Sequence, residues 1–167
     1  VKHAWRTADG WMSETVSGEP MYGWYASLAL APASPDTPQI AYMGGGNQFH
    51  LAYAWRTAGG WFTETVDEQA YSGRFASLAP VPSAPYTPHI SYLGGAYEDL
   101  KHAWRGPAGW EIDVLDSEGD VGWYTSLALA PTSPYTRHIV YWDQTNAVLK
   151  HAWGAGGGWR RERISAA

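Results

Sequence analysis

The amino-acid sequence predicts an all-β protein built from repeated units, and three observations support this fold class. A tetrapeptide ending in Ala-Trp recurs at residues 2–5, 52–55, 101–104 and 150–153, with spacings of 50, 49 and 49 residues. A second tryptophan follows each copy six positions later. The chain also contains 11 Trp, 11 Tyr and 19 Gly residues, a composition that suits many short strands joined by tight turns. Self-similarity at this period indicates a propeller or a solenoid.

The third repeat shows four short strand-like runs. They cover Leu100–Arg105, Trp110–Leu115, Tyr124–Ala130 and His138–Trp142. Clusters of Gly, Pro, Ser and Asp separate them, as expected for turns. Four antiparallel strands in about 50 residues is the size of one propeller blade, in which a small sheet radiates from a central axis.

The repeat resembles a family of bacterial β-propeller repeats whose strands read roughly S-L-A-L, P-H-I-S-Y, L-K-H-A-W and G-W-x-x-E. In this chain the four elements stand at Ser126–Leu129, Arg137–Tyr141, Leu149–Trp153 and Gly158–Glu162. The resemblance extends over the whole chain. It implies four-stranded antiparallel blades in which the S-L-A-L strand is the innermost.

A proline supports the same placement independently. Pro80 takes the position that Leu30 and Leu129 hold in the other copies. Proline has no N–H to donate, so within sheets it is confined to edges. The innermost strand of a blade has such a free edge, which faces the central channel.

With this phasing the chain is a single domain that forms part of a β-propeller, with about 3.5 blades. The repeats cover residues 1–50, 51–99 and 100–148, and a partial repeat covers 149–167. Residues 1 to about 17 would be an outer strand pair that precedes three complete blades. Closed propellers typically have about four to eight blades. We therefore expect a second chain or missing sequence to complete the ring, and the start of the chain in mid-repeat slightly favours missing sequence.

Composition excludes several classes of function. A net charge of −5 with only three lysines provides no basic surface for nucleic acid. The sequence has no run of 18 apolar residues that would predict membrane insertion, and no signal peptide is visible. The absence of cysteine excludes disulfides and thiolate chemistry. No phosphate loop, dinucleotide fingerprint or nucleophile elbow occurs, so we expect no cofactor.

Each repeat places a histidine or tyrosine opposite a carboxylate. If the hairpin turns about the middle of residues 7–10, the facing pairs are His3 with Glu14, Tyr53 with Glu64, His102 with Asp113, and His151 with Glu162. Such a pair could act as an acid and a base. A catalytic pair is needed only once, however, whereas a buried polar bond is useful in every blade. We therefore expect these eight residues to be structural.

Two groups of residues are candidates for ligand binding. Trp24 and Trp123 follow glycines in the long connection between repeats, where grooves open between blades, and Arg74 holds the equivalent position. Exposed aromatic rings beside polar groups are typical platforms for sugars. The first group is Trp24, Tyr25, Arg74, Trp123 and Tyr124. The second group is Arg6, Arg56 and Arg105, which lie beside the paired tryptophans and suit cation–π contacts at hairpin ends.

The chain is also distantly similar to propeller lectins, which bind sugars between blades. In the fucose-binding members an Arg follows the Ile of the second strand, and a Glu precedes the Trp by three positions. Those positions carry Ala41, Ser91 and Val140, and Lys2, Ala52, Lys101 and Lys150. We therefore do not expect a fucose site of that type.

Metal and catalytic sites are poorly supported. Asp116, Glu118 and Asp120 form one acidic loop that loosely suggests calcium, but the other repeats do not share it. The six histidines lack a zinc-binding spacing, and we expect no metal. An enzyme would need residues that break the repeat, and the candidates Glu98, Asp99 and Asp143 are better interpreted as turn residues.

These observations favour a non-enzymatic binding module whose partner is a glycan or another surface ligand, bound at repeated sites between blades. The resemblance implies a bacterial protein that is secreted or on the cell surface. A scaffold for protein contacts is the main alternative, and it predicts that Trp24 and Trp123 are buried. A glycosidase-like or lyase-like enzyme over the central channel is the weakest alternative. A homo-oligomer that closes the ring is a further possible partner.

Overall fold

The computed structural model describes residues 1–17, 23–32, 37–45 and 48–164. All regular structure in these residues is β, in fourteen strands that form four antiparallel sheets. The first sheet is a hairpin of β1 (Lys2–Thr7) and β2 (Gly10–Thr15). Among the described residues, none belongs to a helix that could cross a membrane. The all-β prediction is therefore confirmed.

Three four-stranded meanders follow, here called sheets 1, 2 and 3. Sheet 1 consists of β3 (Trp24–Ala31), β4 (Thr37–Gly44), β5 (His50–Thr57) and β6 (Gly60–Asp67). Sheet 2 consists of β7 (Arg74–Pro80), β8 (Pro88–Gly94), β9 (Asp99–Gly106) and β10 (Gly109–Asp116). Sheet 3 consists of β11 (Val121–Leu129), β12 (Arg137–Asp143), β13 (Val148–Ala155) and β14 (Gly158–Arg163).

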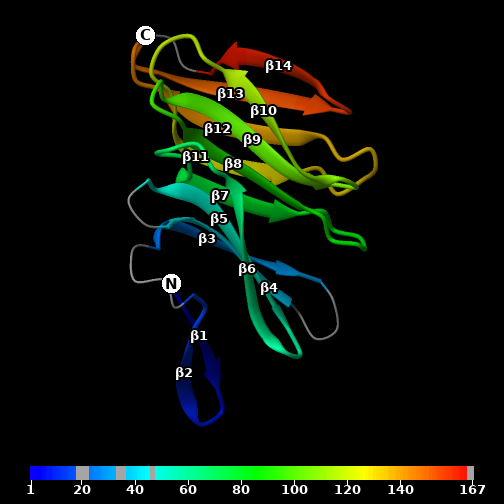
Figure 1. Cartoon of the computed structure of the whole chain (residues 1–167). Helices are drawn as coiled ribbons and strands as arrows, with labels where there is room; N and C mark the ends of the chain where they lie inside the picture. Colours follow the sequence, from blue (N-terminus) through cyan, green and yellow to red (C-terminus); the bar gives the residue numbers. More distant parts are fainter. Residues whose placement is uncertain (18–22, 33–36, 46–47, 165–167) are drawn as a thin grey trace.

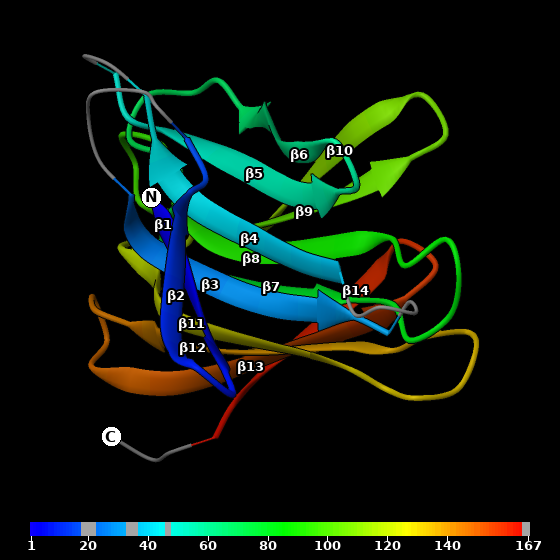
Figure 2. The ribbon, with the colours of Figure 1, turned by 90° about the horizontal axis from the view of Figure 1, so that it is seen from below.

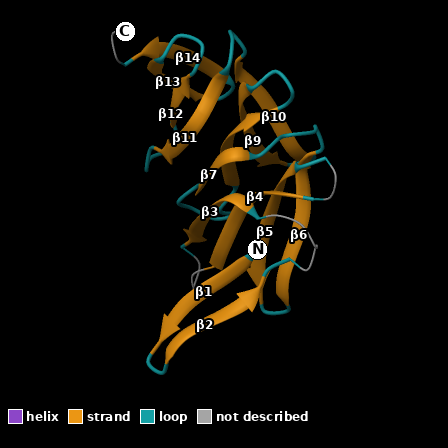
Figure 3. Ribbon diagram, turned by 90° about the vertical axis from the view of Figure 1, so that its left-hand side faces the viewer, coloured by secondary structure: helices purple, strands orange, loops and turns teal. Residues whose placement is uncertain are grey.

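The sheets lie side by side and meet most closely along their first strands. β3 contacts β7, and β7 contacts β11, so the three first strands form one continuous line (Figures 1 and 2). Figure 3 shows the β1–β2 hairpin at one end of the stack and sheet 3 at the other. The stack does not close on itself.

Burial follows from the position of each sheet in the stack. All seven residues of β8 are buried, because sheets 1 and 3 cover both faces of sheet 2. The equivalent strand β12 alternates between buried and more exposed residues, the pattern of a sheet covered on one face only. Ile90, Tyr92, Ile139 and Tyr141 are fully buried and lie in the core clusters between the sheets.

The sequence located the strands of the third repeat well. Each of the four predicted runs falls on a strand, and only Tyr124–Ala130 is displaced, because β11 begins earlier, at Val121. Pro80 lies in β7, which is one of the two edge strands of sheet 2, as predicted. The edge position lets a residue without an N–H stand in a strand without breaking the ladder.

A buried aspartate ties each sheet to the next. Asp67, at the end of β6, accepts hydrogen bonds from Tyr92 (2.8 Å) and Lys101 (3.1 Å) of sheet 2. Asp116, at the end of β10, accepts the same bonds from Tyr141 (2.7 Å) and Lys150 (2.5 Å) of sheet 3. An ion pair this deep is stable only when its remaining lone pairs are also bonded. A hydroxyl and an ammonium group meet that requirement at both interfaces.

Burial alone would raise the pKa of both aspartates. Backbone and side-chain hydrogen bonds together with the lysine charge outweigh burial, and the pKa of each carboxyl is held below its usual value. A lowered pKa means that each carboxylate stabilises the fold above the pKa of the unfolded chain. That contribution is lost as the pH falls through the folded-state pKa.

The first interface, between the β1–β2 hairpin and sheet 1, has neither the aspartate nor the lysine. Ser17 holds the position of Asp67 at the end of the β1–β2 hairpin, and Ala52 holds the position of Lys101 in β5. Neither a lone aspartate nor a lone lysine is left at this interface, which avoids the desolvation of an unpaired charge.

We predict that the two charges at the second interface depend on each other. Asp67→Ser should lower the free energy of unfolding by about 3–5 kcal/mol, because Lys101 is left buried without its counter-ion. The double variant Asp67→Ser/Lys101→Ala recreates the first interface and should lose clearly less. Urea denaturation of both variants measures the difference, and Glu118→Gln, at an exposed carboxylate, is the matched control. Equal losses in the single and double variants would contradict the prediction.

Candidate functional site

Three aromatic residues at one repeat position form a continuous row across the first strands. Tyr25, Phe75 and Tyr124 lie near the start of β3, β7 and β11. The ring centroids are 4.7 Å apart between Tyr25 and Phe75 and 4.5 Å apart between Phe75 and Tyr124. Tyr25 is 41% exposed and Tyr124 67% exposed, whereas Phe75 is half-buried between them. We call these three residues the aromatic row.

All three members of the row have a left-handed backbone. Their φ angles are +54°, +54° and +52°, and each lies at an irregularity in the pairing of the first strand with the second. This conformation costs a residue other than glycine about 1–3 kcal/mol. Strain at the same position in every complete sheet shows that the bulge is a built feature of the repeat, and it turns each ring out of the sheet.

A glycine stands two residues before each of these aromatics, and in sheets 2 and 3 it lets the connecting segment lie close against the preceding sheet. A Cβ on Gly73 would lie 3.0 Å from the Cα of Leu51, and one on Gly122 would lie 2.8 Å from the Cα of Leu100. Both glycines also have positive φ angles. The connecting segment therefore crosses close against the preceding sheet before the first strand begins.

The two predicted tryptophans directly precede Tyr25 and Tyr124 in the chain, and of the two, Trp123 contacts the aromatic row. Trp24 is 50% exposed and stacks on Phe49, with ring centroids 5.7 Å apart. Trp123 is half-buried, lies 5.3 Å from Phe75, and donates its indole N–H to Asp120. The structure thus brings Tyr25, Trp123 and Tyr124 together with Phe75, a residue that the sequence analysis did not single out.

Arg74 holds the tryptophan position in sheet 2 and is committed to an ion pair. Its Nη1 donates to Glu98 Oε1 at 2.8 Å. The pair also occupies Glu98, one of the acidic residues considered for catalysis. Asp143 is likewise engaged, by Asn146 and Lys150, and Asp99 is the first residue of β9.

The register expected between the third and fourth strands of each repeat is the one observed. His3 faces Glu14, Tyr53 faces Glu64, His102 faces Asp113, and His151 faces Glu162. Hydrogen bonds join the first pair (3.2 Å) and the last pair (3.0 Å). In the two middle pairs the carboxylates bond instead to the following sheet.

These carboxylates connect neighbouring sheets through a tryptophan. Glu64 accepts the indole N–H of Trp110 at 3.0 Å, and Asp113 accepts that of Trp159 at 3.1 Å. Glu64 also binds the guanidinium group of Arg105. A carboxylate that receives a ring N–H and a cation from the next sheet fixes how closely the two sheets approach.

Two of the three predicted arginines take part in these contacts. Arg56 Nε lies 3.0 Å from Glu14 Oε1, and Arg105 pairs with Glu64 and lies between the rings of Trp55 and Trp110. Arg6 is exposed on β1. The cation–π geometry suggested by the sequence is therefore present around Arg105.

Sheet 3 replaces the missing arginine from a neighbouring strand. Gly154 stands where Arg56 and Arg105 stand in the other sheets, and its cross-strand partner is Arg137. The Arg137 guanidinium lies 4.8 Å from the centroid of the Trp159 ring and donates to the carbonyl of Gly154 at 3.3 Å. The cation is thus kept over the tryptophan although it comes from a different strand.

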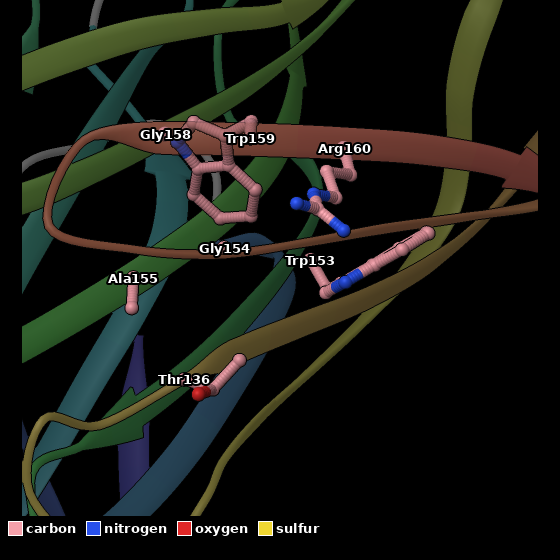
Figure 4. Close-up of a pocket in the computed structure, with 7 residues that line it drawn as sticks. All are labelled: Thr136, Trp153, Gly154, Ala155, Gly158, Trp159 and Arg160. Atoms are coloured by element: carbon pink, nitrogen blue, oxygen red, sulfur yellow. The ribbon is translucent and has the colours of Figure 1, made fainter.

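Two shallow pockets occur at equivalent places in sheets 2 and 3. One has a volume of about 410 Å³ and is shown in Figure 4; it is lined by Thr136, Trp153, Gly154, Ala155, Gly158, Trp159 and Arg160. The other has a volume of about 380 Å³ and is lined by Pro85, Thr87, Pro88, Arg105, Gly106 and Pro107. In Figure 4 the Arg160 side chain lies beside Trp153, its cross-strand partner.

The acidic loop considered for calcium is not arranged around a shared ligand position. Asp116 is bonded to Tyr141, Lys150 and Arg161, and Asp120 accepts from Trp123. In the described part of the chain, no three His, Asp or Glu side chains form a group that could hold a metal ion.

Sequence comparisons assign no family to this chain. No family model matches it, and no curated protein matches it. Among solved structures, it is similar to a crystal structure of AofleA from Arthrobotrys oligospora, a mutant in which three evenly spaced arginines are replaced by alanine. The TM-score is 0.65 at 18% identity, over 95% of this chain and 48% of that one. The chain shares the fold of that structure and spans about half of its length.

Two histidines form a buried pair between sheets 2 and 3. His89 Nδ1 and His102 Nε2 are 3.0 Å apart, and both side chains are buried. Burial lowers the pKa of His89 to about 4, and burial also lowers that of His102, with the charge of Arg137 acting in the same direction. The second nitrogen of His102 is buried without a partner in the described structure. The pair is therefore neutral at neutral pH.

We predict that this pair makes the fold sensitive to mild acid. Because the folded-state pKa lies below that of an unfolded histidine, stability is complete above about pH 6.5 and falls as the pH drops towards 4, where the unfolded chain binds the proton first. For His89 the loss should reach about 3 kcal/mol. Sheet 1 carries Gln39 and Tyr53 at these positions.

The matched test is therefore the double variant His89→Gln/His102→Tyr. Its free energy of unfolding, measured by urea denaturation from pH 7 to pH 4, should vary much less than that of the wild type. A wild-type stability that is constant over this range would contradict the assignment.

Proposed function

We propose that the chain is part of a β-propeller and that its repeated blades form a non-enzymatic binding module for glycans. The observation that carries the proposal is the aromatic row, in which the same strained position of three successive sheets presents a ring to the surface.

Three features support the propeller arrangement. Each sheet is a four-stranded meander that begins at an edge strand, and the edge strands of successive sheets lie against one another. A proline occupies one of those edges, as an inner strand allows. A solved structure of about twice the length shares the fold over 95% of this chain. Under this proposal β3, β7 and β11 are the innermost strands, as in the bacterial repeats that the sequence resembles.

The aromatic row has the chemistry that a sugar needs. A tyrosine has an apolar face for the C–H groups of a sugar ring and a hydroxyl for hydrogen bonding, at a low cost in side-chain entropy. Tyr25 and Tyr124 are exposed, and Phe75 holds their rings in one line. Trp123, which lies 5.3 Å from Phe75 and is half-buried, extends the platform.

Exposure separates this proposal from the scaffold alternative. A scaffold without a small-molecule site predicts that Trp24 and Trp123 are buried, but Trp24 is half exposed and Trp123 keeps a partly accessible face. Two of the three acidic residues considered for an enzyme are engaged: Glu98 by Arg74, and Asp143 by Asn146 and Lys150. These contacts favour binding over catalysis.

Repetition suits a ligand that is itself repeated. Several weak sites on one rigid body can raise the overall affinity by about two to four orders of magnitude when the target is multivalent. Glycans of cell surfaces are targets of this kind, which fits a bacterial protein that acts as a secreted or surface-attached molecule. We include this location in the proposal.

We predict that the two tyrosines of the aromatic row can be removed without loss of stability. In the variant Tyr25→Gly/Tyr124→Gly, the left-handed backbone no longer strains a side chain, so the denaturation midpoint should equal or exceed that of the wild type. Binding on a broad glycan array should fall at least tenfold. Tyr97→Ala, at a tyrosine that is more exposed but lies outside the row, is the matched control. Unchanged glycan binding in the glycine variant would exclude the row as the site.

A further inference from the structure

Sheet 1 has an uncovered apolar face beside its first strand. Leu28 is 54% exposed and Leu30 is 53% exposed. At the equivalent of Leu28 in the other sheets, Leu78 and Leu127 are only 6% and 8% exposed, because the first strand of the preceding sheet lies against them. The same leucine is therefore buried wherever a complete sheet precedes it.

Sheet 3 has an uncovered face of the opposite kind. His138 and Val140 of β12 retain exposure, whereas their equivalents His89 and Ser91 in β8 are buried under sheet 3. Within the chain, the corresponding face of sheet 1 packs on sheet 2, and that of sheet 2 packs on sheet 3. In both cases it covers the face that carries the equivalent of Leu28. The two uncovered surfaces of one chain are thus complementary by the rule of its own repeat.

A directional hydrogen bond accompanies each complete interface. The backbone N–H of Leu78 donates to Ser27 Oγ at 3.0 Å, and that of Leu127 donates to Ser77 Oγ at 3.0 Å. The third serine of the series is Ser126, which is exposed on the uncovered side of sheet 3. The equivalent N–H group in sheet 1 is that of Leu28, in β3.

The two outer hairpins have the same residues at their interface positions. β1–β2 carries Glu14 and Ser17, and the last hairpin of the chain carries Glu162 and Ser165, of which Ser165 lies outside the described residues. The middle interfaces instead carry aspartate at the serine position. Sheet 1 has Ala52 where the lysine partner of that aspartate would stand. Both hairpins, and no other outer strand pair in the sequence, therefore match sheet 1.

We propose that the uncovered face of sheet 3 packs on the uncovered face of sheet 1 in a second copy of the chain. In this head-to-tail dimer, Ser126 of one copy accepts the N–H of Leu28 of the other, and Glu162 meets Arg56. Six four-stranded sheets then close a ring, within the range of about four to eight that propellers adopt. The inference rests on the proposed propeller architecture. Two copies also match the length of the solved structure that shares the fold, since one chain covers 48% of it.

The β1–β2 hairpin must yield its place to β13–β14 of the other copy. Within one chain this hairpin packs on sheet 1 through contacts such as Val16 with the cluster of Ile40 and Tyr42, His3 with Trp61, and Glu14 with Arg56. It has no inner strands to cover Leu28 and Leu30. A complete sheet makes the same outer contacts and adds the inner ones, so the exchange increases the buried apolar area.

Cysteine cross-linking tests the interface directly, because the chain contains no cysteine. Ser126→Cys and Leu28→Cys are made in separate full-length chains, which are mixed and oxidised. We expect a covalent dimer on a non-reducing gel. The double variant Ser77→Cys/Leu127→Cys, at the equivalent position within one chain, is the internal reference. Cross-linking in the reference without a dimer in the mixture would overturn the proposal.

Sedimentation of the unmodified protein provides a second and independent measurement. At micromolar concentration the wild type should have twice the chain mass of 18.4 kDa. Leu28→Asp should weaken the dimer at least a hundredfold, and Val114→Asp, at an exposed valine on the outermost strand of sheet 2, should leave it intact. A monomeric wild type would overturn the dimer. Glycan binding is scored separately: a monomer that binds glycans fails this inference alone, and a dimer that binds none fails only the proposed function.

Discussion

A sheet in this chain cannot bury both of its faces by itself, and this constraint governs the rest of the structure. Each four-stranded meander has apolar residues on two sides, and only a neighbouring sheet can cover them. Sheet 2 has a neighbour on both sides, and β8 is buried throughout. Sheets 1 and 3 each lack one complete neighbouring sheet. Leu28 and Leu30 of sheet 1 are therefore exposed, and residues of β12 alternate between buried and more exposed positions. Stability is therefore a property of interfaces between repeats, as in other repeat proteins.

The interfaces tolerate changes only when both sides change together. Where Ser17 replaces the buried aspartate, Ala52 replaces the lysine across the interface. Where Gly154 removes the arginine, Arg137 supplies a guanidinium from the adjacent strand. In the first case the physical reason is that an unpaired buried charge destabilises more than the loss of a complete pair. The repeats of one chain thus record which contacts are coupled, without comparison to any other protein.

The sequence predicted the strands and the hairpin register because both depend on local signals. The turn at residues 7–10 fixes which residues face each other, and Glu14 therefore lies opposite His3 as expected. The hydrogen-bond partners of the middle carboxylates were missed because they come from the next sheet, more than 40 residues away. One signal could have revealed them: the carboxylate and the second tryptophan recur together in every copy.

The candidate site was predicted in part for a related reason. Trp24, Tyr25, Trp123 and Tyr124 were recognisable as aromatics after a glycine. Phe75 follows Gly73 at the same spacing, but Arg74 interrupts the aromatic pair, and Phe75 was not singled out. The place of Phe75 in the aromatic row depends on a left-handed backbone at a bulge. A residue other than glycine gives no sign of that conformation in the sequence.

That conformation is also the strongest indication that the row has a role beyond packing. Tyr124 is strained and two-thirds exposed, so its ring gains little burial to offset the cost of its backbone. A glycine would satisfy the same backbone without strain, and glycines are frequent in this chain. The proposed function accounts for aromatic residues at all three positions, because under that proposal the rings themselves contact the ligand.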